Sequence, residues 1–246
     1  MTARLRIPLA SSLLAGARDL LFPAFCLGCG CPLPTGSLPL LCPGCRGSLI
    51  FGRSPCCTCC GLPFAAGSDH LCGHCLRNQP GFDLARFALH YCGPVPRLIQ
   101  DLKFHGLTTP LATMACLVRL SGVARHLAEP DLLLPVPLHP ARLRRRGFNQ
   151  SLLIARACFP EWRSRIEPHL LVRRRPTVPQ TSLTGASRRR NLRGAFALCR
   201  DRRLDNRRVL LVDDVFTTGS TVRECVAVLR RAGAVRIEVF TLSRSL

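Results

Sequence analysis

The segment that most constrains this chain runs from Val209 to Thr221 and joins a short apolar run to a turn rich in hydroxyl groups. Residues 209–212 are apolar and bounded by charge, which predicts a buried strand, and the apolar period after residue 221 predicts a helix. Between them lie two carboxylates, Asp213 and Asp214. After Val215 and Phe216 comes a polar turn of Thr217, Thr218, Gly219, Ser220 and Thr221. A strand, an acidic pair, a small polar turn and a helix, in that order, predict an anion-binding site.

We expect the turn to hold a phosphate group. Gly219 can adopt a positive φ, which would point the backbone N–H groups of residues 218–221 at a phosphate on the helix N-terminus. The hydroxyl groups add donors without adding charge. Asp213 and Asp214 would repel a phosphate, but they suit sugar hydroxyls or a water-bridged Mg²⁺. The segment therefore predicts a site for a phosphorylated sugar with free hydroxyls.

This segment resembles the phosphoribosyl-diphosphate (PRPP) signature of type I phosphoribosyltransferases. It is neither a Walker A loop nor a dinucleotide-binding Gly-x-Gly-x-x-Gly sequence. The alternative is an ordinary strand-to-helix connection with a Ser or Thr cap and solvated carboxylates.

A second segment brings positive charge to the end of another predicted strand. Residues 132–137 predict a buried strand. Its prolines indicate either that the strand lies at a sheet edge or that the prolines lie at the C-terminal end of the strand. The strand-to-helix loop that follows contains Arg142, Arg144, Arg145 and Arg146, and then Asn149 and Gln150, which open a helix. Ligands of open parallel sheets bind at the C-terminal ends of the strands, so we expect these six residues to bind substrate, with the guanidinium groups holding a pyrophosphate. A solvated basic loop or a nucleic-acid patch is the alternative.

Two further basic features could lie near the predicted phosphate and pyrophosphate site. Lys103 lies near the end of a helix predicted over residues 95–105, and we expect it to be a surface lysine rather than a phosphate contact. Residues 174–190 are rich in Pro, Ser, Thr and Arg and lack an apolar period, which predicts a mobile loop. This loop, with the arginines at 188–193, either closes over a pyrophosphate or is a disordered basic linker.

Paired cysteines dominate residues 24–80. Four Cys-x2-Cys pairs are formed by Cys26, Cys29, Cys42, Cys45, Cys57, Cys60, Cys72 and Cys75. Two pairs about a dozen residues apart can supply four thiolates to a tetrahedral Zn²⁺. We expect two tandem zinc ribbons with one or two structural zinc ions, and the spacing leaves an interleaved arrangement open. Because so small a module buries little apolar surface, metal binding would supply its folding free energy.

The frame of the third cysteine pair is ambiguous. Cys56 and Cys59 have the same spacing, but Cys57 and Cys60 are preferred because Gly61 follows the second ligand. Cys31 is then a spare thiol, and His70 and His74 are expected to be loop histidines rather than ligands. Metal-type spacing favours a reducing cytoplasm over a secreted disulfide scaffold.

Strands alternate with helices from residue 81 onward, which predicts an α/β fold with a mainly parallel sheet and helices on both faces. The expected domains are an amphipathic helix within 1–23, a double zinc ribbon over 24–80 and a type I phosphoribosyltransferase-like domain over 81–246. An export signal is the alternative for the first segment. No apolar run is long enough to predict a transmembrane helix, and we expect a cytoplasmic protein.

Several segments together resemble the ComF family, also described as competence protein F or GntX-like proteins. They are the paired cysteines, residues 98–104, Pro-Val-Pro-Leu-His-Pro at 135–140, Arg-Gly-Phe-Asn-Gln at 146–150, Gln180 with residues 189–196, and residues 209–221. The resemblance spans nearly the whole chain. It implies a double zinc ribbon ahead of a type I phosphoribosyltransferase fold and a role in the uptake and use of external DNA. It implies no defined acceptor base.

One departure from the wider superfamily narrows the chemistry. The transferases that act on 6-oxopurines place an Asp base where this chain has Thr217. Without that base the usual proton acceptor is missing, so a 6-oxopurine acceptor is disfavoured.

Three functions compete. An enzyme would bind PRPP, or another phosphorylated ribose, with Mg²⁺, and its catalytic residues would be Asp213, Asp214 and Arg146. A single-stranded DNA-binding module, acting with competence or helicase proteins, would explain the net charge of +21, although one Trp and one Tyr offer little stacking surface. A PRPP-sensing regulator on the same fold is the third.

Overall fold

The computed structural model describes residues 23–34, 36–175, 194–199 and 202–246. At its centre lies a four-stranded sheet in the order β3-β8-β7-β4. The strands are β3 (Leu84–His90), β4 (Leu132–Pro135), β7 (Arg208–Phe216) and β8 (Arg236–Arg244). All three neighbouring pairs run parallel, which confirms the predicted sheet.

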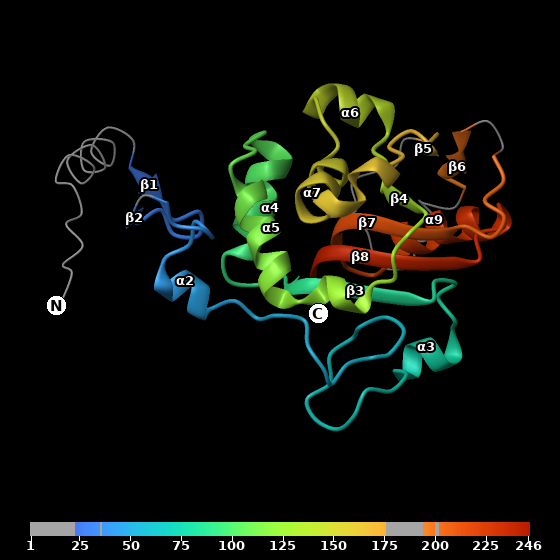
Figure 1. The fold of residues 1–246 in the computed structure, drawn as a ribbon, viewed down its shortest axis with the longest axis horizontal. Coiled ribbons are helices and arrows are strands. Elements are labelled where there is room, and N and C mark those ends of the chain that lie inside the picture. Colours follow the sequence, from blue (N-terminus) through green and yellow to red (C-terminus); the bar gives the residue numbers. More distant parts are fainter. Residues whose placement is uncertain (1–22, 35, 176–193, 200–201) are drawn as a thin grey trace, which may run out of the picture.

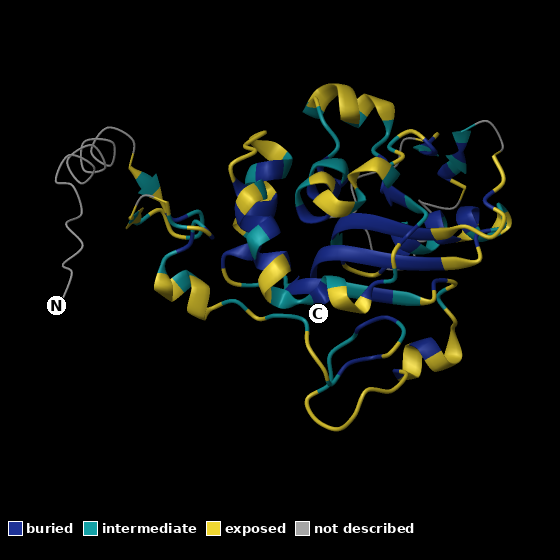
Figure 2. Ribbon diagram, in the orientation of Figure 1, coloured by how far each residue is buried: buried dark blue, intermediate teal, exposed yellow. Residues whose placement is uncertain are grey.

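The two central strands, β7 and β8, are buried along almost their whole length (Figure 2). Their near-continuous apolar runs fit strands that are covered on both faces. Strand β4 lies at the sheet edge and ends at Pro135, which pairs with Val212. Proline is tolerated at the end of an edge strand, where its missing N–H removes no bond between neighbouring strands.

Helices cover both faces of the sheet (Figure 1). One face packs against α4 (Val95–Phe104), α5 (Pro110–Ser121) and α7 (Gln150–Cys158), with the short 3-10 helices η1 (Val123–His126) and η2 (Pro160–Arg165) nearby. The other face packs against α9 (Ser220–Arg231), whose buried residues include Val222, Val226 and Leu229. A small antiparallel pair, β5 (Leu171–Arg173) and β6 (Phe196–Leu198), shares the core on the α9 side.

The arginine-rich segment after β4 is helical, although the sequence predicted a loop. Helix α6 spans Pro140–Arg146. Pro140 occupies its first turn, the side chain of His139 accepts a hydrogen bond from the N–H of Ala141, and Gly147 ends the helix with φ 83°. These are common start and stop signals, and they outweigh the absence of an apolar period.

The cysteine-rich region forms two small units. The first ribbon, residues 24–47, contains β1 (Ala24–Phe25), paired antiparallel with β2 (Pro32–Leu33), and α2 (Pro43–Gly47). It contacts α5, because the N–H of Leu40 donates to Oγ1 of Thr113 at 3.0 Å. The second ribbon, residues 56–77, ends in α3 (Gly73–Arg77) and lies along β3, where the N–H of Ala85 donates to the carbonyl of Cys59. Figure 1 shows the two units at different sides of the sheet domain.

Two expected features lie outside the described residues: the N-terminal amphipathic helix, and residues 176–193 of the basic segment. In the part of the chain that the structure describes, none of the helices is long and apolar enough to cross a membrane.

Candidate functional site

The acidic pair lies inside strand β7, because the strand continues to Phe216 and does not end before the pair as the sequence suggested. Asp213 is buried, and its Oδ1 accepts hydrogen bonds from Oγ of Ser151 at 3.0 Å and from the N–H of Asp214 at 2.9 Å. Burial, and then the neighbouring charge of Asp214, raise the pKa of Asp213 to about 7. The position of Asp213 in the strand therefore makes it a poor carrier of negative charge at neutral pH.

Asp214 has a cationic partner that the sequence analysis assigned to the surface. Nζ of Lys103 lies 2.9 Å from Oδ2 of Asp214, and the lysine side chain is 23% exposed. The expectation of a surface lysine was wrong. The C-terminal end of α4 lies close to the end of β7, so Lys103 reaches Asp214. A buried carboxylate needs a charged or hydrogen-bonding partner, and Lys103 meets that need.

The phosphate turn, which we define as residues 217–221, connects β7 to the N-terminus of α9. Gly219 has φ 70°, and a Cβ built on it would lie 2.7 Å from the ring of Phe216. Glycine is therefore required here by both conformation and space. Oγ1 of Thr218 and Oγ of Ser220 are 2.8 Å apart, so these hydroxyls and the helix N-terminus gather donors in one place.

A cavity of about 240 Å³ lies beside the acidic pair. Its lining consists of Lys103, Phe104, Gly106, Arg142, Arg145, Arg146 and Phe148. Arg142, Arg145 and Arg146 share one face of α6 because residues three and four apart on a helix are neighbours. Arg144, the fourth predicted arginine, is exposed and does not line the cavity.

Arg146 is the most enclosed of these arginines. Its Nη1 donates to Oε1 of Gln150 at 2.5 Å, and its guanidinium lies 5.7 Å from the ring centroid of Phe104. Burial lowers the pKa of Arg146, and the nearby carboxylate of Asp214 opposes that change. Arginine keeps its charge under such shifts, so Arg146 is a fixed cation between α6 and the acidic pair.

The two amide residues after α6 have different roles. Oδ1 of Asn149 accepts from the N–H of Ser151, and its Nδ2 donates to the carbonyl of Val136. Asn149 therefore caps α7 and fixes it to the end of β4. Gln150 orients Arg146. Neither residue lines the cavity, although the sequence analysis placed both among the substrate-binding residues.

Three side chains of this region escaped the sequence analysis. Ser151 bonds Asp213, and Phe104 and Phe148 provide the apolar part of the cavity. Ser151 follows the cap residue of α7, which is a detectable signal. The aromatic rings meet only through the packing of α4 against the α6–α7 connection, which a single sequence does not encode locally.

The thiols gather into two clusters. The Sγ atoms of Cys57, Cys60, Cys72 and Cys75 all lie within 4.8 Å of one another, and those of Cys26, Cys29, Cys31 and Cys42 do the same. Each cluster uses consecutive parts of the chain, so the arrangement is tandem and not interleaved. Four thiols at this spacing fit a tetrahedral Zn²⁺.

The first cluster contains a thiol that the prediction left spare. Cys31 lies within 4.8 Å of Cys26, Cys29 and Cys42, and the thiol of Cys45, a predicted ligand, interacts with the same three cysteines. The cause is the β1–β2 hairpin: Phe25 pairs with Pro32, and this places Cys26 and Cys31 side by side.

Backbone N–H groups in the second cluster favour the thiolate form of a cysteine, which is the form that binds a cation. Burial would raise the pKa of Cys57, but the backbone N–H groups of Cys72 and Cys60 point at its sulfur and bring the pKa to about 6. Metal binding needs thiolates, so this donor pattern favours it. His70 stacks on Phe64 and His74 contacts Arg223, and within the described residues neither joins a cluster.

Comparisons with known proteins agree with this architecture. A model of the double zinc ribbon domain matches residues 17–76, and a model of the phosphoribosyl transferase domain matches residues 170–245. Competence protein F of Haemophilus influenzae is 36% identical over 211 residues, which cover 83% of this chain and 90% of that protein. The DNA utilization protein YhgH of Escherichia coli strain K12 is 34% identical over 229 residues, which cover 91% of this chain and 98% of that protein.

Proposed function

The chain belongs to the ComF family, together with competence protein F and YhgH, and we propose that it binds PRPP, or another phosphorylated ribose, with Mg²⁺. The phosphate turn would hold the 5-phosphate and Asp213 and Asp214 the ribose hydroxyls. The cavity beside α6 would hold the pyrophosphate.

One observation supports this assignment above the others. Lys103 pairs with Asp214 and also lines the basic cavity. A single side chain therefore joins the acidic pair to the cation-lined space. A ligand with sugar hydroxyls at one end and a pyrophosphate beside them matches both halves, whereas an isolated phosphate would use only the turn.

The acidic pair fits a divalent cation as well as a sugar. Burial raises the pKa of Asp213 first and the charge of Asp214 raises it further, so a cation held by the two carboxylates would favour their ionised forms. Mg²⁺ in such sites binds one or two carboxylates and the phosphate oxygens of the ligand. When bound, it would neutralise charge on the pyrophosphate, and Asp213 and Asp214 are the residues that would hold it.

A protein that binds PRPP in this way could transfer the phosphoribosyl group to an unidentified acceptor base. The bond between ribose C1 and the pyrophosphate oxygen breaks as the acceptor bonds to C1. Arg142, Arg145 and Arg146 would stabilise the departing pyrophosphate through fixed positive charge. Thr217 offers no carboxylate base, so a 6-oxopurine remains a disfavoured acceptor.

Calorimetric titration with PRPP and Mg²⁺ tests the proposal. We expect one site in the wild-type protein and at least tenfold weaker binding by Asp214→Ala, because a charged hydrogen-bond partner of the ribose is lost. Asp205→Ala removes an exposed carboxylate that pairs with Arg203 and should bind like wild type. No heat of binding, or equal affinity of all three proteins, would refute the proposal.

A second function has support from the charge of the molecule. The net charge is +21, and α6 presents exposed arginines (Figure 2). The names of the relatives refer to competence and to DNA utilization. Binding of single-stranded DNA in the cytoplasm would use this charge and should weaken steeply as salt rises. Fluorescence anisotropy across a salt series tests it, and salt-independent binding would exclude a charge-based contact.

A further inference from the structure

The second ribbon contacts the phosphate turn through one arginine. Arg223 lies in the first turn of α9, and its Nη2 donates to the carbonyl of Thr218 at 3.0 Å. Its Nη1 lies 3.0 Å from Nε2 of His74. Because arginine only donates, Nε2 of His74 accepts. His74 lies in α3 between Cys72 and Cys75, so one guanidinium connects the thiol cluster to the turn.

A second arginine makes a parallel connection. Arg244, at the end of β8, is 8% exposed. Its Nη1 donates to the carbonyl of Cys60 at 2.5 Å, and its guanidinium lies 4.7 Å from the ring centroid of Phe216. The ring of Phe216 is the group that leaves no room for a Cβ on Gly219. The second ribbon is therefore connected to Thr218 of the turn through Arg223, and to Phe216, which precedes the turn, through Arg244.

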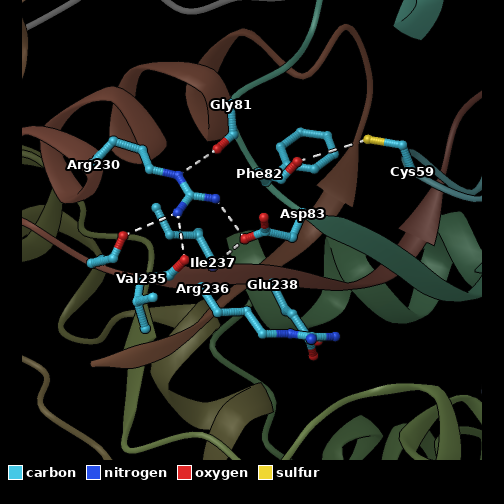
Figure 3. Close-up of polar contacts among 10 residues, drawn as sticks. Cys59, Gly81, Phe82, Asp83, Arg230, Val235, Arg236, Ile237 and Glu238 are labelled. Carbon is cyan, nitrogen blue, oxygen red and sulfur yellow. Dashed lines mark hydrogen bonds and ion pairs between the residues drawn. The ribbon is translucent and has the colours of Figure 1, made fainter. Parts of the chain in front are cut away.

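The far end of α9 is also fixed to the chain that leaves the second ribbon (Figure 3). Nε of Arg230 donates to the carbonyl of Gly81 at 2.8 Å, and its Nη2 contacts Oδ2 of Asp83 at 2.5 Å. Oδ2 of Asp83 also accepts from the N–H of Ile237 in β8 at 2.7 Å. In the same view, Sγ of Cys59 contacts the carbonyl of Phe82. Helix α9 is thus held against the second ribbon at its N-terminus and against the linker at its C-terminus.

We propose that the second ribbon positions the phosphate turn, so that Zn²⁺ bound by Cys57, Cys60, Cys72 and Cys75 and a phosphate bound by residues 217–221 strengthen each other's binding. Arg223 is the positioning residue: bound zinc fixes α3, His74 fixes the guanidinium, and the guanidinium fixes the carbonyl of Thr218. This inference rests on the proposed function, because it requires that the turn binds phosphate. Coupling between two sites is reciprocal, so it is measurable from either side.

The test uses the zinc-loaded full chain and ribose 5-phosphate as the probe. Calorimetry should show roughly tenfold weaker binding by Arg223→Ala, the middle of the range usual for coupled sites. Arg223→Lys should restore part of the loss, because lysine reaches one of the two partners. Arg231→Ala removes an exposed arginine from the same helix. Among the described residues, its side chain bonds the carbonyl of Ala227 within that helix, and the variant should leave the affinity unchanged.

Release of zinc to a chromogenic chelator supplies a second measurement that needs no variant. Ribose 5-phosphate should slow the release of one zinc ion, that of the second ribbon, by severalfold. The first ribbon contacts α4 and α5, through Arg97 with Gly28 and Thr113 with Leu40, and serves as the internal reference. In Arg223→Ala the effect of the ligand should disappear.

The outcomes separate the two proposals. If the wild-type protein fails to bind ribose 5-phosphate and PRPP, both are overturned. If it binds them but the ligand leaves zinc release unchanged, or Arg223→Ala binds as well as wild type, the coupling is overturned and the proposed function stands. Should Arg223→Ala not fold, the zinc-release measurement on the wild-type protein decides alone.

Discussion

At the residue scale, Asp213 is the group whose chemistry depends most on its neighbours. The sequence shows that Asp213 belongs to an acidic pair near the end of a predicted strand, and this much could be predicted. The raised pKa could not, because it arises from burial in the folded protein and from the charge of Asp214. Ser151, which bonds Asp213 and opposes the rise, is 62 residues away in the chain. Lys103 illustrates the same limit: its partner Asp214 comes from another element, and local sequence gives no sign of it.

The pH dependence of stability should reveal Asp213. Its pKa is about 7 in the folded protein, against 3.8 for an ordinary aspartate. Between these values the folded state keeps a proton that the unfolded state has lost, so this group lowers the free energy of unfolding as pH rises. Asp213→Asn should remove this dependence. Between pH 5 and pH 8, the free energy of unfolding of the wild-type protein should therefore fall by about 1–3 kcal/mol more than that of the variant. Urea unfolding in Mg²⁺-free buffer measures this, and parallel pH profiles would contradict it.

Gly219 is the residue of the turn that tolerates least change. Gly219→Ala combines a positive φ with a contact of 2.7 Å to the ring of Phe216. We expect a loss of about 1–3 kcal/mol in stability and weaker binding of ribose 5-phosphate, because the turn must shift. Gly47→Ala, where a Cβ meets nothing within 4 Å, is the matched control. Equal melting temperatures and affinities would show that the turn is not constrained as described.

At the element scale, α6 carries sequence signals for a helix that the prediction of a loop did not use. Pro140 and Gly147 mark its start and end, yet its lack of apolar residues suggested a loop. The helical form matters because it selects three arginines for the cavity and turns Arg144 away. Strand β7 shows the opposite case: its apolar run was recognised, but its continuation through two aspartates follows from pairing with β8 at Asp213–Thr241 and Val215–Ser243.

Two of the four arginines of α6, Arg146 and Arg144, provide a direct test of that helical face. Arg146→Ala should weaken binding of PRPP roughly tenfold, because charged hydrogen bonds to the pyrophosphate are lost. Binding of ribose 5-phosphate, which has no pyrophosphate, should hardly change. Arg144→Ala should affect neither ligand. Calorimetry with both ligands compares the proteins, and a similar loss in Arg144→Ala would mean that α6 acts only through diffuse charge.

At the scale of the whole molecule, the second ribbon is part of the core of the sheet domain. Cys57, Cys60, Cys72 and Cys75 belong to the same buried cluster as Leu211 and Val239 of the sheet. The predicted boundary at residue 80 treated residues 24–80 as one module. Among its described residues, the first ribbon contributes only Cys26 and Leu41 as buried residues to the core cluster on the other face of the sheet. Regular Cys-x2-Cys spacing predicts metal ligands, but it does not show how many of them each core buries.

Loss of zinc should therefore have unequal effects. Cys72→Ser should lower the free energy of unfolding of the whole domain by several kcal/mol, because the cluster is buried in a shared core. Cys29→Ser alters the exposed ligand of the first cluster and should mainly affect that ribbon. Thermal unfolding with zinc quantified in each variant measures the difference. Equal losses would mean that both ribbons support the domain alike.

The central claim is that one ligand spans the phosphate turn and the basic cavity. Competition calorimetry tests it most directly, by titrating PRPP with Mg²⁺ into wild-type protein saturated with either ribose 5-phosphate or pyrophosphate. We predict that each fragment lowers the apparent affinity for PRPP, because each occupies one half of the same site. PRPP binding that neither fragment alters would contradict the claim and place the ligand elsewhere on the molecule.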